Sequence, residues 1–172
     1  ATWINSKGLD AKRMSTALRE LSPSKSDSDL IVPGPLVRIG DDSRDVPSIS
    51  MPYGINVPIV HASAGIRRIV ALAYMLVWAW KEHVIAAHLL GEKRAKNVVM
   101  IVDEIESHLH PKWQRSILEA LIGLNKKMYS DAAIQLIVST HSPLVLASAE
   151  RYFDEDTDKW FDFDLTKKNS TE

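Results

Sequence analysis

The chain has 172 residues, enough for one ordinary domain, and its 45% hydrophobic and 25% charged content is typical of a soluble globular protein. A net charge of −1 provides no global basic field, so the charge balance gives no support for DNA as a partner. The absence of cysteine excludes disulfides and thiolate metal sites. The longest apolar run, 69–80, is too short to span a bilayer, and no signal-peptide pattern opens the chain. We therefore expect a cytoplasmic protein with no membrane partner.

Residues 1–50 look least like a complete domain. A helix is predicted over 10–21, followed by a polar, mobile linker over 22–29 and a short strand over 36–39. No residue type or spacing in this segment indicates chemistry.

Small residues precede a long, mostly apolar helix that is predicted over about 66–90. Ser63, Ala64 and Gly65 stand just before it, where closely spaced N–H groups and the positive end of the helix dipole favour phosphate binding. The alternative is that Ser63 is only the N-cap of the helix. Arg67 and Arg68 follow, and they suit either phosphates and a partner's acids or a solvated helix end.

The run 98–102 is apolar, short and rich in Val, which predicts a strand buried on both faces of a parallel sheet. Asp103 and Glu104 follow directly, at the strand end where ligands of open α/β sheets bind. Adjacent strand residues point to opposite sides, so one acid could hold Mg²⁺ while the other orients an attacking water. The alternative is that both acids merely cap the next element.

A second strand is predicted over 134–138, after a helix that Pro111 begins and that carries an apolar stripe. Strand, helix and strand give a right-handed parallel crossover, so the two strand ends should be neighbours. His141 would then share a sheet edge with the acidic pair and could contact a terminal phosphate. A short helix is expected after Pro143, and the acidic, aromatic stretch that follows could hold one more short strand before a frayed tail at 166–172.

Taken together, these motifs resemble the C-terminal half of an ABC-type ATPase domain, near the OLD, RecF and SMC-like branch of bacterial AAA family ATP-binding proteins. The resemblance covers about 53–165, and it places a C-terminal lobe at 51–165. Four stretches carry it: 98–104 resembles a Walker B strand with its catalytic glutamate, 104–111 the acidic HLHP segment, 139–143 the switch-histidine loop, and 63–68 a divergent signature motif.

The resemblance implies an α/β, P-loop NTPase-like (ABC-type) partial domain with a parallel sheet and flanking helices. It also implies ATP and Mg²⁺ as cofactors and ATP hydrolysis at a composite site in a dimer with a second ABC-type subunit, a homodimer by expectation. The implied roles are metal support by Asp103, catalysis by Glu104 and His141, and nucleotide binding by Ser63, Ala64, Gly65 and Arg67. Such a clamp or switch would gate an effector, for example a nuclease, in anti-phage defence or DNA maintenance.

Two departures from the family pattern stand out. The signature stretch is SAGIRR and lacks the LSGG form, and no G-x-x-x-x-G-K-[ST] occurs among the seven glycines. We expect an N-terminal Walker A lobe to precede Ala1 or to come from another chain, which would make 1–50 the end of an insertion or lid between lobes.

Two other functions compete with the ATPase. The chain could be a non-catalytic binding or scaffold module for a partner or DNA, which the missing Walker A favours. It could also be another α/β hydrolase that uses Glu104 and His141 as acid and base, although no nucleophile motif supports that reading.

Overall fold

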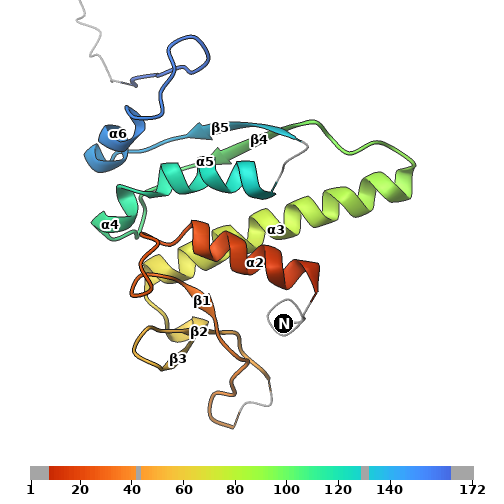
Figure 1. The fold of residues 1–172 in the computed structure, drawn as a ribbon, viewed down its shortest axis with the longest axis vertical. Coiled ribbons are helices and arrows are strands. Elements are labelled where there is room, and N and C mark those ends of the chain that lie inside the picture. The colour runs from red at the N-terminus through yellow and green to blue at the C-terminus, as the bar shows by residue number, and fades with distance from the viewer. Residues whose placement is uncertain (1–7, 42–43, 129–131, 164–172) are drawn as a thin grey trace, which may run out of the picture.

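The computed structural model describes residues 8–41, 44–128 and 132–163. The described chain has a mixed α/β fold with two small sheets, one antiparallel and one parallel (Figure 1). Its elements, in order, are α2 Leu9–Glu20, β1 Val32–Pro33, β2 Ser48–Ser50, β3 Asn56–Pro58, the 3-10 helix Ile59–His61, α3 Ala64–Leu90, β4 Asn97–Val102, α4 Pro111–Gln114, α5 Ile117–Met128, β5 Ala133–Val138 and α6 Pro143–Ala149.

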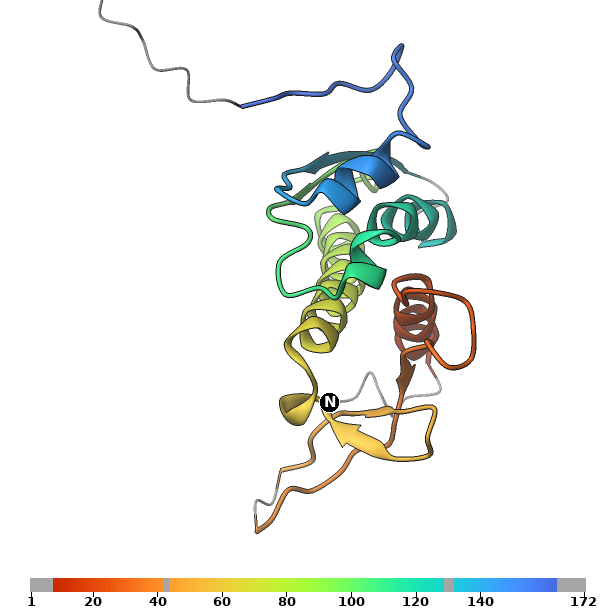
Figure 2. The ribbon, with the colours of Figure 1, turned by 90° about the vertical axis from the view of Figure 1, so that its left-hand side faces the viewer.

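The parallel sheet pairs β4 with β5, and the predicted strand–helix–strand crossover is confirmed. The register runs from Asn97↔Ala133 to Val102↔Val138, so the two strands end level with each other. Consequently the residues after Val102 and those after Val138 start from the same edge. Figures 1 and 2 show α3 and α5 on the same side of this sheet.

The prediction that these strands are buried on both faces is wrong for the described structure. Burial alternates along both strands, and the outer face leaves Val99, Ile101 and Ile137 exposed by 56%, 73% and 47%. Only the inner face packs against the core. The outer face is exposed because no described element lies over it, although the apolar composition of β4 is typical of a strand buried on both faces.

The hydrophobic core joins the first part of the chain to the rest. Met14 and Leu18 of α2 are almost fully buried, in the same cluster as Ile69 of α3 and Leu124 of α5. The helix predicted over 10–21 is thus confirmed as α2, and the core crosses the boundary that the sequence analysis placed at residue 50.

The polar linker predicted over 22–29 is held to the rest of the chain at both ends, while 25–28 are exposed. Ser22 is buried, where its hydroxyl donates to the Leu18 carbonyl at 2.7 Å and accepts from the Ile31 N–H at 2.9 Å. Asp29, at the other end of the predicted linker, pairs with Lys112. The contact between Ser22 and Ile31 lies within the turn, and the pair of Asp29 and Lys112 joins the turn to α4.

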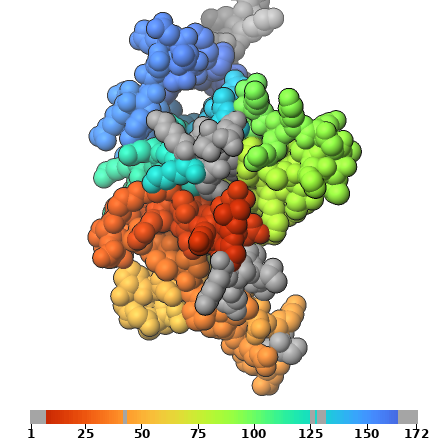
Figure 3. Space-filling view, turned by 45° about the vertical axis from the view of Figure 1, so that its right-hand side comes forward, coloured from red at the N-terminus to blue at the C-terminus, as the bar shows by residue number. Residues whose placement is uncertain are grey.

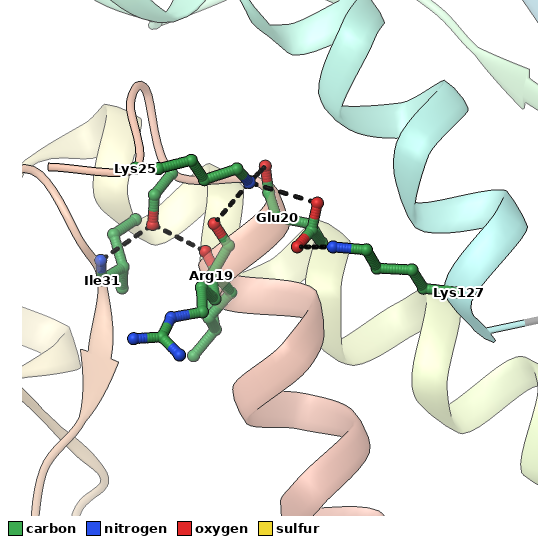
Figure 4. A network of polar contacts seen from close by, with 7 residues as sticks. Arg19, Glu20, Lys25, Ile31 and Lys127 are labelled. Carbon is green, nitrogen blue, oxygen red and sulfur yellow. Dashed lines mark hydrogen bonds and ion pairs between the residues drawn. The ribbon is translucent and has the colours of Figure 1, made fainter.

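One buried acid ties α2 to α5. The Glu20 carboxylate accepts hydrogen bonds from Lys127 at 2.6 Å and Lys25 at 3.1 Å (Figure 4). Burial pushes the pKa of Glu20 upward, but the hydrogen bonds from Lys127 and Lys25 outweigh it and leave the pKa below its usual value. The carboxylate therefore stays ionised in this partly buried position.

Three further expectations differ from the structure. The strand expected over 36–39 is reduced to a single bridge, Val37↔Val46. The helix that begins at Pro111 is interrupted near Arg115, which separates α4 from α5. No strand occurs in the described tail, residues 151–163, and its side chains are exposed. The tail extends from the end of the molecule opposite the small antiparallel sheet (Figure 3). The predicted frayed tail at 166–172 lies outside the described residues.

The long helix predicted over about 66–90 is confirmed as α3. By length and composition alone it could cross a membrane, with a mean hydropathy of 1.4 over an 18-residue window. However, seven of its residues are buried in the protein, and helices in protein cores can have the same length and hydropathy. In the structure α3 packs against α2 and contributes Ile69, Ala73 and Val77 to the core.

Candidate functional site

The two predicted acids follow β4 in a run of turns and are held by the neighbouring strand end. The Ser139 hydroxyl donates to a carboxylate oxygen of Asp103 and accepts from the backbone N–H of Glu104 at 2.9 Å. The Ser139 carbonyl also accepts from the Ile105 N–H at 3.2 Å. One serine thus fixes both acids relative to β5, while Asp103 and Glu104 themselves stay exposed.

Glu104 has an unusual backbone conformation. Its φ is +45°, in the left-handed region, which costs a non-glycine residue about 1–3 kcal/mol, and strained residues of this kind cluster at functional sites. The Arg68 guanidinium donates to the carbonyl oxygens of Asp103 at 3.1 Å and Glu104 at 2.7 Å. Arg68 is therefore hydrogen-bonded to the turn after β4 and is not a solvated helix end, while a contact with phosphate or with a partner's acids stays a prediction.

The start of α3 lies against the same turn. Gly65 is buried, and a Cβ added to it would come within 2.8 Å of the His108 carbonyl oxygen. Only glycine permits this close approach of α3 to the backbone after β4. The structure therefore gives Gly65 a packing role within the chain.

The other predicted nucleotide-binding residues also make contacts within the chain or face solvent. Ser63 is the N-cap of α3, and its hydroxyl accepts from the Ile66 N–H at 3.3 Å. Arg67 donates to the Val60 carbonyl at 3.2 Å, and Ala64 is exposed. The N-cap interpretation of Ser63 is confirmed, and nucleotide binding by this set stays a prediction.

The switch-histidine loop is anchored by an acid that the sequence analysis did not single out. Glu106 accepts from the His141 backbone N–H at 2.6 Å and from the Thr140 hydroxyl at 2.5 Å. Burial pushes the pKa of Glu106 upward, but the hydrogen bonds from Thr140 and the His141 N–H hold it below its usual value. Because only the backbone of His141 is engaged here, its exposed ring is not used in this anchor.

The loop then leads into α6 through a second polar contact. Ser142 is buried and caps α6, accepting from the N–H groups of Leu144 and Val145. Its hydroxyl donates to Gln114 of α4 at 2.7 Å. Both ends of the switch-histidine loop are therefore fixed to the segment between β4 and α5.

The structure brings most of the predicted site to one edge of the parallel sheet. Asp103 and Glu104 meet the His141 loop there, and the first turn of α3 reaches the same turn through Gly65. The sequence analysis missed Ser139 and Glu106 and assigned Arg68 no contact. The available signals were a third acid two residues after Glu104 and hydroxyls on both residues before His141.

The described acids at this edge do not form a complete metal site by themselves. Among the described residues no group of three or more His, Cys, Asp and Glu side chains is placed to hold an ion. The exposed carboxylate of Asp103 would suit Mg²⁺, which is usually bound through one or two carboxylates, keeps several waters and shares its remaining positions with substrate phosphates.

A parallel crossover with an Asp-Glu pair after one strand and a histidine loop after the next is the arrangement of an AAA/ABC-like ATPase domain with a P-loop NTPase-like fold. Residues 6–147 match the family described as "AAA domain, putative AbiEii toxin, Type IV TA system", and the chain belongs to this family.

Two curated relatives match shorter stretches. The "Retron Vc95 probable ATPase" of Vibrio cholerae serotype O1 biovar El Tor is 46% identical over 50 residues, which is 29% of this chain and 9% of that protein. The "Retron Ec83 probable ATPase" of Escherichia coli is 45% identical over 47 residues, 27% of this chain and 8% of that protein. The matches thus span less than a tenth of these relatives.

One solved structure resembles the chain more broadly but weakly. It comes from work titled "Structural biochemistry of ATP-driven dimerization and DNA stimulated activation of SMC ATPases" and is 17% identical, with a TM-score of 0.47 over 81% of this chain and 71% of the other. At that score the likeness supports no statement about function.

Proposed function

We propose that the chain supplies the Walker B and switch-histidine half of a composite ATP-hydrolysing site. The observation that carries this proposal is the meeting of the Asp103–Glu104 turn with the His141 loop at one sheet edge, through Ser139 and Glu106. Family membership makes ATP the expected ligand, and the geometry at the sheet edge supports a separate role for each part.

Each of the three exposed residues has a separate task in this proposal. Glu104 orients and polarises the attacking water, since no described residue donates a hydrogen bond to its carboxylate and it is exposed at the strand end. Asp103 would hold Mg²⁺, which neutralises phosphate charge when bound. The His141 ring would contact the γ-phosphate, where charge changes most during transfer.

A lobe carrying the Walker A loop is the first partner of this half-site. The exposed outer face of β4 and β5, with Val99, Ile101 and Ile137, is the apolar surface on which we propose that this lobe packs. Central strands of parallel sheets are covered on both faces, so a partner here restores the expected burial.

A second ABC-type subunit is the other proposed partner. Ser63, Ala64 and Arg67 are exposed at the first turn of α3, next to the acidic turn. N–H groups at this helix start can meet a phosphate held by the other subunit, which closes the site only when two subunits meet. ATP would then close the dimer and hydrolysis would release it, which provides a switch for an effector such as a nuclease in defence or DNA maintenance.

The test is Mg·ATP turnover by the chain alone and after addition of protein that carries a Walker A lobe. Activity that appears only on mixing is expected. In the active mixture Glu104→Gln should abolish turnover and leave ATP-dependent dimerisation intact, because it changes the reacting group and not the fold. Glu92→Gln, at an exposed glutamate between α3 and β4, is the matched control and should be fully active. Normal turnover by Glu104→Gln would refute the proposal.

A scaffold without catalysis is the second candidate, and the lack of a Walker A sequence in the 172 residues favours it. DNA or partner binding that neither ATP nor His141→Ala changes, together with no turnover in any mixture, would support the scaffold.

A further inference from the structure

We propose that Glu106 is a positioning residue, whose carboxylate fixes the switch-histidine loop to the acidic turn so that His141 and Glu104 keep one relative placement. This inference rests on the ATPase function proposed above and assigns Glu106 a role in the same site.

The geometry of the contact supports positioning. One oxygen of Glu106 accepts from the backbone N–H of His141 at 2.6 Å, and the other accepts from the Thr140 hydroxyl at 2.5 Å. Thr140 in turn accepts from the Ser142 N–H at 3.1 Å, at the start of α6. The Glu106 carboxylate, at the start of the crossover, therefore orders three consecutive residues, 140–142, at its end.

Glu104 and Glu106 differ in exposure and in hydrogen bonding, which suits them to different roles. Glu104 is exposed, and its carboxylate receives no hydrogen bond from the part of the chain that the structure describes. Glu106 is half-buried and each of its carboxylate oxygens already accepts one hydrogen bond, so it is less available to an attacking water than the exposed Glu104 carboxylate. Because its hydrogen bonds hold its pKa below the usual value, Glu106 stays ionised and remains an acceptor at neutral pH.

The backbone contact explains how an acid can act through a histidine without touching its ring. The N–H of His141 is fixed, so the Cα of His141 keeps its place while the exposed ring stays available for a phosphate. Loss of the acceptor would leave the loop attached only through Ser139 and Ser142, on either side of His141. Displacement by about 1 Å of a group that acts in the transition state can lower a rate about 100-fold.

The experiment measures kcat and KM for Mg·ATP in the complete ATPase assembled from this chain and its Walker A lobe. Glu106→Ala is expected to lower kcat about 100-fold and to change KM less than about threefold, because the lost placement matters in the transition state. Thr140→Val removes one of the two contacts and should lower kcat about tenfold.

Glu106→Gln is the conservative rescue. A glutamine carbonyl still accepts from the His141 N–H, and its NH₂ can donate to the Thr140 hydroxyl oxygen, so kcat should recover to within about tenfold of the unmodified protein. Glu150→Ala, at an exposed glutamate just after α6, is the matched control and should leave kcat unchanged.

Amide hydrogen exchange at His141 gives a second readout that is independent of turnover. The N–H of His141 should be protected in the unmodified chain and in Glu106→Gln, and should exchange faster in Glu106→Ala.

The outcomes separate this inference from the function on which it rests. Unchanged kcat in Glu106→Ala would overturn the inference and leave the proposed ATPase function intact. Equal losses of kcat in Glu106→Ala and Glu106→Gln would also overturn the inference, because they would show that the site needs the negative charge of Glu106 and not its hydrogen bonds. If Glu106→Ala does not fold, unchanged kcat in Thr140→Val overturns the inference. No turnover in the unmodified assembly would overturn the proposed function and this inference with it.

Discussion

Replacement of Gly65 by alanine tests the contact between α3 and the turn after β4. A Cβ at this position would lie 2.8 Å from the His108 carbonyl oxygen, whereas ordinary contacts begin at 3.4 Å. The opposing atom belongs to the backbone, so it cannot swing aside as a flexible side chain would. Either α3 or the turn must move, and the turn also carries Glu104 and Glu106.

The size of the effect follows from two opposing terms. Overpacking of this kind costs about 1–3 kcal/mol, and alanine regains up to about 1 kcal/mol of helix propensity, less in the first turn where Gly65 lies. The expected net loss is about 1–2 kcal/mol of unfolding free energy, which lowers Tm by about 3–6 °C for a chain of this size.

Urea and thermal unfolding of the chain measure this loss, and Gly123→Ala is the matched control. Gly123 lies inside α5, where an added Cβ would come no closer than 3.7 Å to Glu20. The same chemical change should therefore stabilise the protein by about 0.4–1 kcal/mol at that position. If Gly65→Ala proves as stable as Gly123→Ala, the close approach of α3 to the turn is not a real constraint.

Three further variants test other contacts. Ser139→Ala removes the hydroxyl shared by Asp103 and the next amide, so turnover in the assembled ATPase should fall about 10–100-fold while urea unfolding shows a loss of about 1 kcal/mol. Glu20→Gln removes a carboxylate whose pKa is lowered on folding. This carboxylate stabilises the folded chain above the unfolded pKa near 4.5, and the stabilisation is lost as the pH falls through the folded pKa. Stability of the variant, followed by urea unfolding across acidic pH, should depend less on pH than that of the unmodified chain. Ile101→Glu should change the unfolding free energy of the chain by less than about 0.5 kcal/mol, since the side chain is 73% exposed, yet should prevent binding of the Walker A lobe in a pull-down.

Local sequence pattern was sufficient to place both strands of the crossover and the long helix that precedes them. The strand after Asn97, the strand before Ser139 and the helix before Gly91 all occur within one or two residues of the predicted limits. These elements are specified by apolar periodicity and by the residues at their ends, which are properties of neighbours in the chain.

Burial and the inner contacts of the site could not be predicted in the same way. The apolar composition of β4 indicated burial on both faces, and the outer face is uncovered because burial depends on other elements and not on the strand alone. Similarly, Glu106 resembled any acid in a charged loop until the crossover placed it against the N–H of His141, 35 residues away in the chain. Such a pairing depends on the register of β4 and β5, and the continuous apolar run of β4 has no alternation of apolar and polar residues that would fix that register.

The turn after β4 is contacted by residues from several motifs that lie far apart in the sequence. Arg68 binds its carbonyl oxygens, Gly65 permits α3 to approach it, and Ser139 and Glu106 join it to the strand end and loop around His141. A nucleotide contact at the first turn of α3 and a phosphate contact at His141 would both act on this one turn. Because the positive φ of Glu104 is strained, surrounding contacts must stabilise it, so a shift of the first turn of α3 or of the His141 loop should change the placement of the Glu104 carboxylate before it changes the fold.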